Sequence, residues 1–143
     1  MKNALISGAV GAVALTILHE TIRNFVAQAP RVDIAGERAI ALTIEIAGFD
    51  PPPARDLYSA ALIGDLVSNS LYYSLVGAGS RENVLLRGAL LGAAAGVGAA
   101  FLPEKIGLGK KPTARTPQTA AMTIGWYLFG GVSAALCYRL LSD

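Results

Sequence analysis

The sequence predicts an all-α integral membrane protein, a bundle of four transmembrane helices with an amphipathic helix in the membrane interface between the first two. Hydrophobic residues make up 53% of the 143 residues and charged residues only 15%, against roughly 45–50% and 25% in soluble domains. The mean hydropathy is +0.49. Most of the 16 glycines lie in apolar stretches, where a soluble helix avoids glycine and a membrane helix uses it for close packing. At this length the chain forms a single transmembrane domain.

Four segments have the length and composition of a membrane-spanning helix, which needs about 20 mostly apolar residues. They cover residues 3–25, 57–76, 83–102 and 118–140. Pro103 is expected to end the third, and Thr116 followed by Pro117 fits the start of the fourth, with the threonine as N-cap. The short turn at residues 77–82 makes the second and third spans antiparallel, and residues 103–116 form a basic loop.

The first segment also has features of a secretory signal peptide. Lys2 precedes the apolar run, and Ala27-Gln28-Ala29 has the form of a cleavage site. However, several polar side chains separate the run from this site, and Pro30 would directly follow the cut. We therefore expect residues 3–25 to be retained as the first span.

Residues 33–48, in the link between the first two spans, fit two patterns. As a helix, the segment places its charged side chains on one side and its apolar ones on the other, which suits a helix lying in the membrane interface. Over residues 40–46, aliphatic side chains instead alternate as in a β-strand. An isolated strand beside a bilayer leaves its edges unpaired. The interfacial helix is therefore the preferred prediction, with an extended segment as the alternative.

The distribution of lysine and arginine predicts the orientation, because cytoplasmic loops are enriched in these residues. If the first link and the basic loop are cytoplasmic, that side carries eight of the 12 basic side chains: Arg23, Arg31, Arg38, Arg55, Lys105, Lys110, Lys111 and Arg115. The other side carries Lys2, Arg81, Arg87 and Arg139. We expect a multi-pass protein of the inner membrane with both termini on the non-cytoplasmic side.

Small residues in the third span predict a close helix–helix contact. Gly88, Gly92 and Gly96 recur at four-residue spacing and therefore share one helical face. Packing within one chain is the preferred interpretation. A homo-oligomer interface through the same three glycines is the alternative.

Polar side chains at membrane depth are the main functional signal, because each is costly there unless it is paired or hydrated. The first span contributes His19, Glu20 and Arg23. The second contributes four residues that share one helical face: Asp65, Ser68, Asn69 and Tyr72. Glu20 would lie about 8 Å and Asp65 about 12 Å from the cytoplasmic ends of their helices. We therefore expect one polar cluster, in which Arg23 neutralises one carboxylate and His19 or a proton the other.

A second candidate site is the end of the basic loop, where cations precede the start of the fourth span. Lys110, Lys111, Arg115 and Thr116 lie there, and Arg31 is placed to form a second wall. Basic residues beside a helix N-terminus suit a phosphate, which predicts binding of an anionic lipid headgroup. The alternative is that these charges only set the topology.

Several functions are excluded or disfavoured. A net charge of +2 gives no sign of a nucleic-acid surface. The chain has no Gly-x-Ser-x-Gly element, no His-Glu-x-x-His zinc motif and no phosphate loop. With a single histidine, nothing in the spacing requires a metal, and no cofactor is predicted.

The preferred function is therefore non-enzymatic: binding or transport of a small solute, an ion or protons at the polar site between the first two spans. The first alternative is a protein that binds or modifies lipids with the same cluster and the basic loop. The second is a structural or assembly subunit, in which the polar cluster only fixes how the helices pack.

Overall fold

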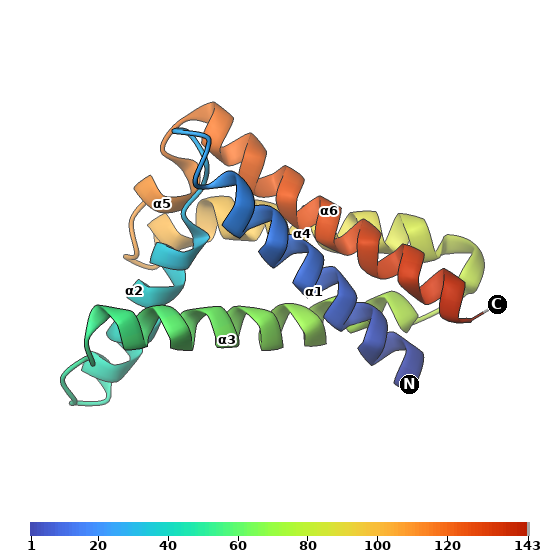
Figure 1. The fold of residues 1–143 in the computed structure, drawn as a ribbon, viewed down its shortest axis with the longest axis horizontal. Coiled ribbons are helices and arrows are strands. Elements are labelled where there is room, and N and C mark those ends of the chain that lie inside the picture. Colours follow the sequence, from blue (N-terminus) through green and yellow to red (C-terminus); the bar gives the residue numbers. More distant parts are fainter. Residues whose placement is uncertain (143) are drawn as a thin grey trace.

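The computed structural model describes residues 1–142, and this range is helical with no strand, as the sequence predicts (Figure 1). The helices are α1 (Lys2–Ile22), α2 (Val32–Ile46), α3 (Ala54–Tyr73), α4 (Val84–Lys105), α5 (Lys111–Ala114) and α6 (Pro117–Leu141). Two short 3-10 turns, η1 (Ser74–Gly77) and η2 (Arg81–Asn83), connect α3 to α4. Residues 33–48, whose sequence fits both a helix and a strand, are mostly helical, since α2 covers most of this segment.

Three helices are long and apolar enough to cross a membrane: Lys2–Ile22, Arg81–Lys105 and Pro117–Leu141. They correspond to the first, third and fourth predicted spans. α3 corresponds to the second predicted span. It has 20 residues but is not among the helices that meet the length and hydropathy requirement for crossing a membrane. Its sequence contains Asp56, Asp65 and several hydroxyl and amide side chains, which lower its hydropathy.

Two helix limits were predicted from the sequence, and the structure confirms one and corrects the other. Thr116 caps α6 as expected, accepting a hydrogen bond from the backbone N–H of Thr119 at 3.1 Å. Pro103 does not end α4, which continues to Lys105. A proline so near the C-terminus removes only one of the last backbone hydrogen bonds. Two residues after the helix ends at Lys105, Gly107 has a φ of +85°, the left-handed conformation that commonly follows the last turn of a helix.

α6 lies at the centre of the bundle, with α4 on one side and α1 on the other. The contact with α4 is a backbone-to-backbone approach at the three glycines predicted to form a seam. A Cβ atom on Gly92 would lie 2.6 Å from the carbonyl oxygen of Tyr127, and Gly88 and Gly96 are similarly enclosed by α6. This face of α4 is thus occupied within the chain. A contact between copies through the same glycines stays a prediction.

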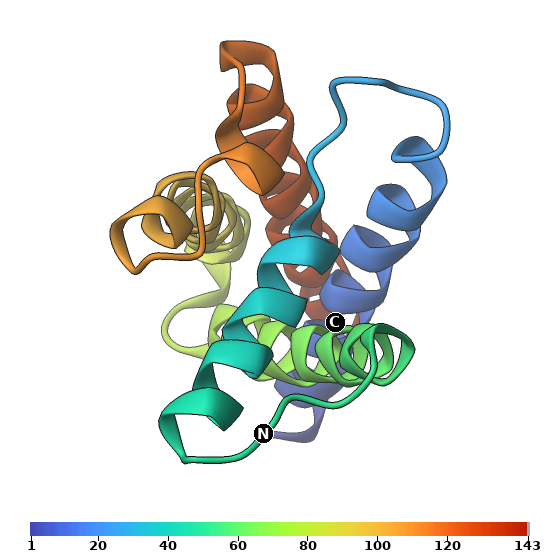
Figure 2. The ribbon, with the colours of Figure 1, turned by 90° about the vertical axis from the view of Figure 1, so that its left-hand side faces the viewer.

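α3 leans across the bundle instead of running beside the other long helices. It crosses α1 at Gly8, where a Cβ atom would overlap the carbonyl oxygen of Ser70. From this crossing the two helices diverge (Figure 1), and α2 lies across the opening (Figure 2). α2 packs on α3, with Gly36 against Ala61. α3 makes little contact with α4 and α6.

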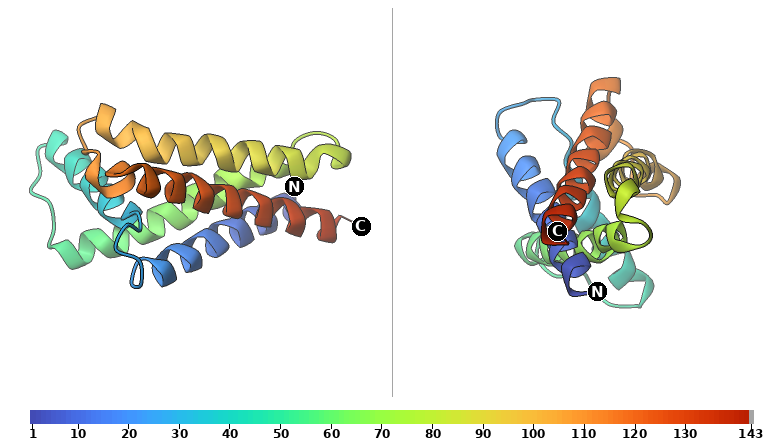
Figure 3. Two further views of the ribbon diagram at one scale, coloured as in Figure 1. Left: turned by 90° about the horizontal axis from the view of Figure 1, so that it is seen from above. Right: turned by 90° about the vertical axis from the view of Figure 1, so that its right-hand side faces the viewer.

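The molecule therefore has two different ends (Figure 3). The narrow end holds both termini and the turn between α3 and α4. The wide end holds α2, α5 and the loops that flank them. The eight basic side chains predicted to share one side lie in the segments of the wide end.

Candidate functional site

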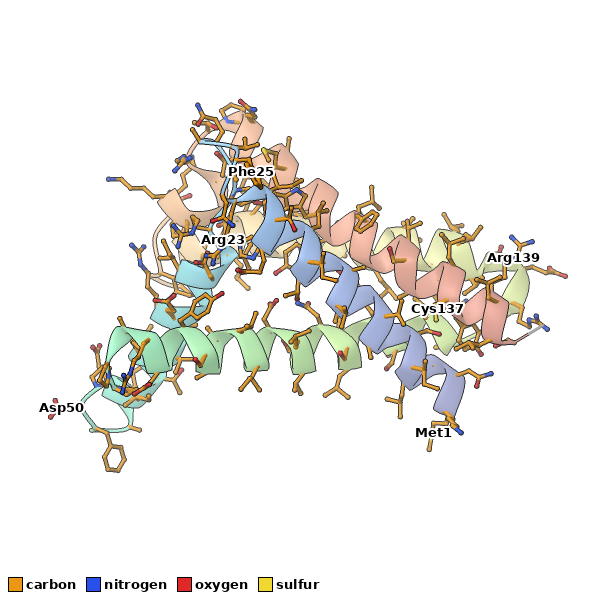
Figure 4. The ribbon with its side chains drawn as sticks, in the orientation of Figure 1. Met1, Arg23, Phe25, Asp50, Cys137 and Arg139 are labelled. Carbon is orange, nitrogen blue, oxygen red and sulfur yellow. The ribbon has the colours of Figure 1, made fainter. Side chains whose placement is uncertain are left out.

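Arg23 is at the centre of a charged cluster where the end of α1 meets the start of α2 (Figure 4). Its guanidinium lies 2.7 Å from the carboxylate of Glu20, one helical turn earlier. The other side of the same guanidinium lies 2.6 Å from the carboxylate of Asp33, in the first turn of α2. Arg23 thus neutralises a carboxylate of its own helix and ties α1 to α2.

Asp33 is the most enclosed member of this cluster, with a side chain only 6% exposed. It also pairs with Arg31 at 2.6 Å, and the Nε2 atom of His19 lies 3.6 Å away. Burial alone would raise the pKa of Asp33, but the contacts with His19 and Arg31, together with the charges of Arg31 and Arg23, hold this pKa well below its usual range. Asp33 is therefore an anion in the folded protein.

Tyr58 brings α3 into the same network. Its hydroxyl donates to Glu20 at 3.0 Å and accepts from Arg23 at 3.3 Å. The guanidinium carbon of Arg23 lies 5.5 Å from the centre of the tyrosine ring, within the range of a cation–π contact. The starts of α2 and α3 are thus both held to the end of α1.

The four residues of the polar face predicted on the second span have different surroundings. Asp65 makes no ion pair within residues 1–142. Ser68 donates to the backbone carbonyl of Asp65 at 3.2 Å, and Tyr72 donates to the carbonyl of Leu91 on α4 at 3.0 Å. Asn69 is buried, and its side chain lies beside the carboxylate of Asp65. Arg23 was expected to neutralise one carboxylate of the first two spans. It pairs with Glu20, and its second partner, Asp33, comes from α2.

A cavity of about 480 Å³ lies in the opening between α1, α3 and α4, with α2 across it. One wall is polar and includes Thr16, His19, Glu20, Asp33, Tyr58 and Asp65. Apolar residues of α2, α4 and the loop after α4 also line it, including Ala39, Ala99, Leu102, Pro103 and Leu108. The volume is that of a typical small-molecule site. The structure thus brings residues of both predicted polar spans, Glu20 and Asp65, to one cavity.

Five buried side-chain polar atoms in the described part of the chain lack a hydrogen-bond partner. They are Thr16 Oγ1, His19 Nε2, Glu20 Oε1, Arg23 Nε and Asn69 Nδ2. Buried polar groups in proteins are nearly always satisfied, by protein or by bound water or ligand. Three of the five atoms belong to Thr16, His19 and Glu20, which line the cavity. The other two belong to Arg23, which pairs with Glu20, and to Asn69, which lies beside Asp65. All five atoms are enclosed by protein beside the cavity, and two of them lie close to a charged partner: His19 Nε2 is 3.6 Å from Asp33, and Glu20 Oε1 is 3.5 Å from His19 Nδ1.

The residues of the predicted anion site make separate contacts. Arg31 turns to Asp33, and its backbone N–H donates to the carbonyl of Pro112 at 2.6 Å. Arg115 donates to the carbonyl of Ala27, so the two segments expected to form two walls do lie side by side. Thr116 is used as the cap of α6. Lys110 and Lys111 are exposed, and neither lines the cavity.

Two residues of the network were not singled out from the sequence as members of the cluster. Asp33 was assigned to the start of the interfacial helix, although the spacing Arg31-x-Asp33 directly before a helix is a signal for a local ion pair. Tyr58 has the appearance of an interfacial aromatic residue, and only the close approach of α3 to α1 shows its role.

Among residues 1–142, no three His, Cys, Asp or Glu side chains are grouped so as to hold a metal ion. In comparisons with known proteins, no protein-family model matches the chain, no curated protein matches it and no solved structure matches its fold.

Proposed function

We propose that this protein binds a small solute in the cavity between α1, α2, α3 and α4, and belongs to the transport class of inner-membrane proteins. The observation that supports this proposal most is a cavity of about 480 Å³ lined by polar side chains of three helices, among them Asp65, which makes no ion pair within residues 1–142. A purely structural network would pair such a group, because an unpaired buried charge or polar group costs free energy. A solute with hydrogen-bonding groups would contact the polar side chains that line the cavity.

The proposal includes α3 as a fourth span. Its 20 residues reach about 30 Å at 1.5 Å per residue, the thickness of a bilayer core. On the side away from the cavity, α3 exposes an aliphatic stripe of Ile63, Val67 and Leu71 at four-residue spacing, which suits lipid. Of the polar residues that lower its hydropathy, Tyr58, Asp65 and Ser68 line the cavity and Asn69 is buried, whereas Asp56 is exposed at the start of the helix. Such one-sided polarity is common where helices line an aqueous site.

In this arrangement the wide end faces the cytoplasm, because it carries eight of the 12 lysines and arginines. Both termini then lie on the non-cytoplasmic side, and α2 lies near the cytoplasmic interface. The polar cluster would be reached from that end. The solute would exchange with the cytoplasm there.

A lipid-binding function remains the second candidate, because apolar residues of α4 line the cavity together with the polar ones. The sequence-based version of this hypothesis joined the polar cluster to Lys111 and Arg115. Neither of these residues lines the cavity, and Arg115 is engaged by the carbonyl of Ala27. This favours a small solute over a phospholipid headgroup.

Filling the cavity tests the proposal. Ala99→Phe adds a ring from α4 to the cavity wall and is expected to remove binding. The probes are three compounds that share a phenyl ring and a four-carbon chain: phenylbutylamine, phenylbutanol and phenylbutyrate. A ligand present at about 100 times its Kd stabilises the folded protein by about 2.7 kcal/mol, so binding is measured as a rise in the unfolding temperature in detergent.

The matched control is Ala94→Phe, on the exposed face of the same helix and outside the cavity. It should leave the ligand-induced rise unchanged. The proposal is wrong if none of the three compounds stabilises the wild-type protein, or if the Ala99→Phe protein responds as the wild type does.

A further inference from the structure

The carboxylates that line the cavity differ in their charge partners. Glu20 is paired with Arg23 at 2.7 Å, and Asp33 with both Arg23 and Arg31 at 2.6 Å. Two carboxylates are thus balanced by two guanidinium groups. Asp65 lines the same cavity without an ion-pair partner among residues 1–142. One carboxyl group on the cavity wall is therefore left without a counter-ion among residues 1–142.

His19 lines the same cavity, but its nitrogen atoms lie near other carboxylates. Nδ1 lies 3.5 Å from Glu20 and Nε2 lies 3.6 Å from Asp33. The opposite side of the imidazole is taken by Trp126, with ring centres 5.4 Å apart. The imidazole is therefore aligned with the two carboxylates that already have arginine partners, and not with Asp65.

The surroundings of Asp65 suit a ligand with a positive head and an apolar body. Asp65 and Tyr127 both line the cavity, so a cation there would lie close to a carboxyl group and an aromatic residue. The lining from α4 and the loop after it includes Ala99, Leu102 and Leu108, which carry no charge. A charged group at membrane depth is costly unless it is paired, so an apolar ligand carrying a cation would suit both parts of the lining.

We propose that the ligand of this cavity is an organic amine with an apolar body, and that Asp65 is its counter-ion. This inference rests on the proposed function and specifies the chemical class of its ligand. The ammonium would lie at Asp65. The hydrocarbon part would lie against α4.

The first test uses the wild-type protein in detergent, so it does not depend on the folding of any variant. Affinities are measured by calorimetric titration for phenylbutylamine, phenylbutanol and phenylbutyrate. Phenylbutylamine is expected to bind about tenfold more tightly than phenylbutanol, and phenylbutyrate more weakly than either. If phenylbutanol or phenylbutyrate binds as tightly as phenylbutylamine, the inference is wrong while the proposed function stands. If none binds, the proposed function fails together with the inference.

The second test assigns the preference to Asp65. D65N is expected to lose the tenfold preference for phenylbutylamine and to keep the affinity for phenylbutanol, because the cavity remains and only its charge is removed. D56N makes the same change on the exposed start of α3, where Asp56 lies 3.4 Å from Arg55 and outside the cavity, and should preserve the preference. A preference for phenylbutylamine that survives in D65N would overturn the assignment.

Discussion

Replacing Asp33 by asparagine is expected to lower the free energy of unfolding by about 2–3 kcal/mol, because it removes one partner from a buried ion pair. The side chain of Asp33 is 6% exposed and that of Arg23 is 17% exposed. Breaking such a pair ordinarily costs about 3–5 kcal/mol. The expected cost is smaller here because Arg23 keeps Glu20, and because Arg31 is 42% exposed and can be hydrated. Unfolding is followed by far-UV circular dichroism in mixed micelles.

A comparison with D56N separates this effect from a general loss of charge. Asp56 makes only a surface pair with Arg55, whose side chain is 88% exposed, so D56N should change the free energy of unfolding by less than about 0.5 kcal/mol. An effect of D56N as large as that of D33N would contradict the role given to the buried pair.

The pH dependence of the same difference is also predicted. The pKa of Asp33 is lower in the folded protein than its ordinary value of 3.8. Its stabilising contribution is therefore present above about pH 4 and is lost as the pH falls below that value, toward the pKa of the folded state. The difference in stability between the wild type and D33N should be smaller at about pH 3 than at about pH 7.

Gly92→Ala is the second change with a large expected effect, about 2–3 kcal/mol of destabilisation from overpacking. A Cβ atom at Gly92 would lie 2.6 Å from the carbonyl oxygen of Tyr127 and 2.7 Å from the Cα atom of Leu128. Both are backbone atoms, so no side chain can turn away and α4 and α6 must separate. The measurement is the midpoint of denaturation in mixed micelles.

Gly98→Ala is the matched control, since Gly98 lies on the same helix with no atom within 4 Å of its added Cβ. Alanine is a better helix former than glycine by up to about 1 kcal/mol in water, so this variant should be as stable as the wild type or more stable. If Gly92→Ala is as stable as Gly98→Ala, the close approach of α4 and α6 is wrong.

The helices and their limits follow largely from local sequence, because apolar length, capping residues and turn glycines act over a few neighbouring positions. Thr116 as the cap of α6 is an example. The end of α4 shows the limit of this reasoning, since Pro103 is the stronger signal in the sequence and yet the helix ends at Lys105, two residues before Gly107. A proline in the last turn destabilises a helix little. Whether Pro103 lies in the last turn is known only once the end of the helix is known.

The site was predicted less completely, because it depends on how helices cross. The depth argument placed Glu20 and Asp65 near one another, and both do line one cavity. It assumed that α1 and α3 run side by side. In the structure they cross at Gly8 and diverge, which leaves room for α2 to bring Asp33 to Arg23. Crossing positions depend on backbone approach between distant segments, and a single sequence does not define them.

The most direct test of the central claim, that one face of α3 lines a solvated cavity within the membrane while the other faces lipid, is cysteine labelling in vesicles. Cys137, the only cysteine, is first replaced by serine. Ser68→Cys, on the cavity side, and Val67→Cys, in the exposed aliphatic stripe, are then treated with a water-soluble, membrane-impermeant maleimide applied to the side that carries the wide end. We expect Ser68→Cys to react and Val67→Cys to remain unlabelled. Equal reactivity of both positions, or labelling of Val67→Cys alone, would contradict the proposed site.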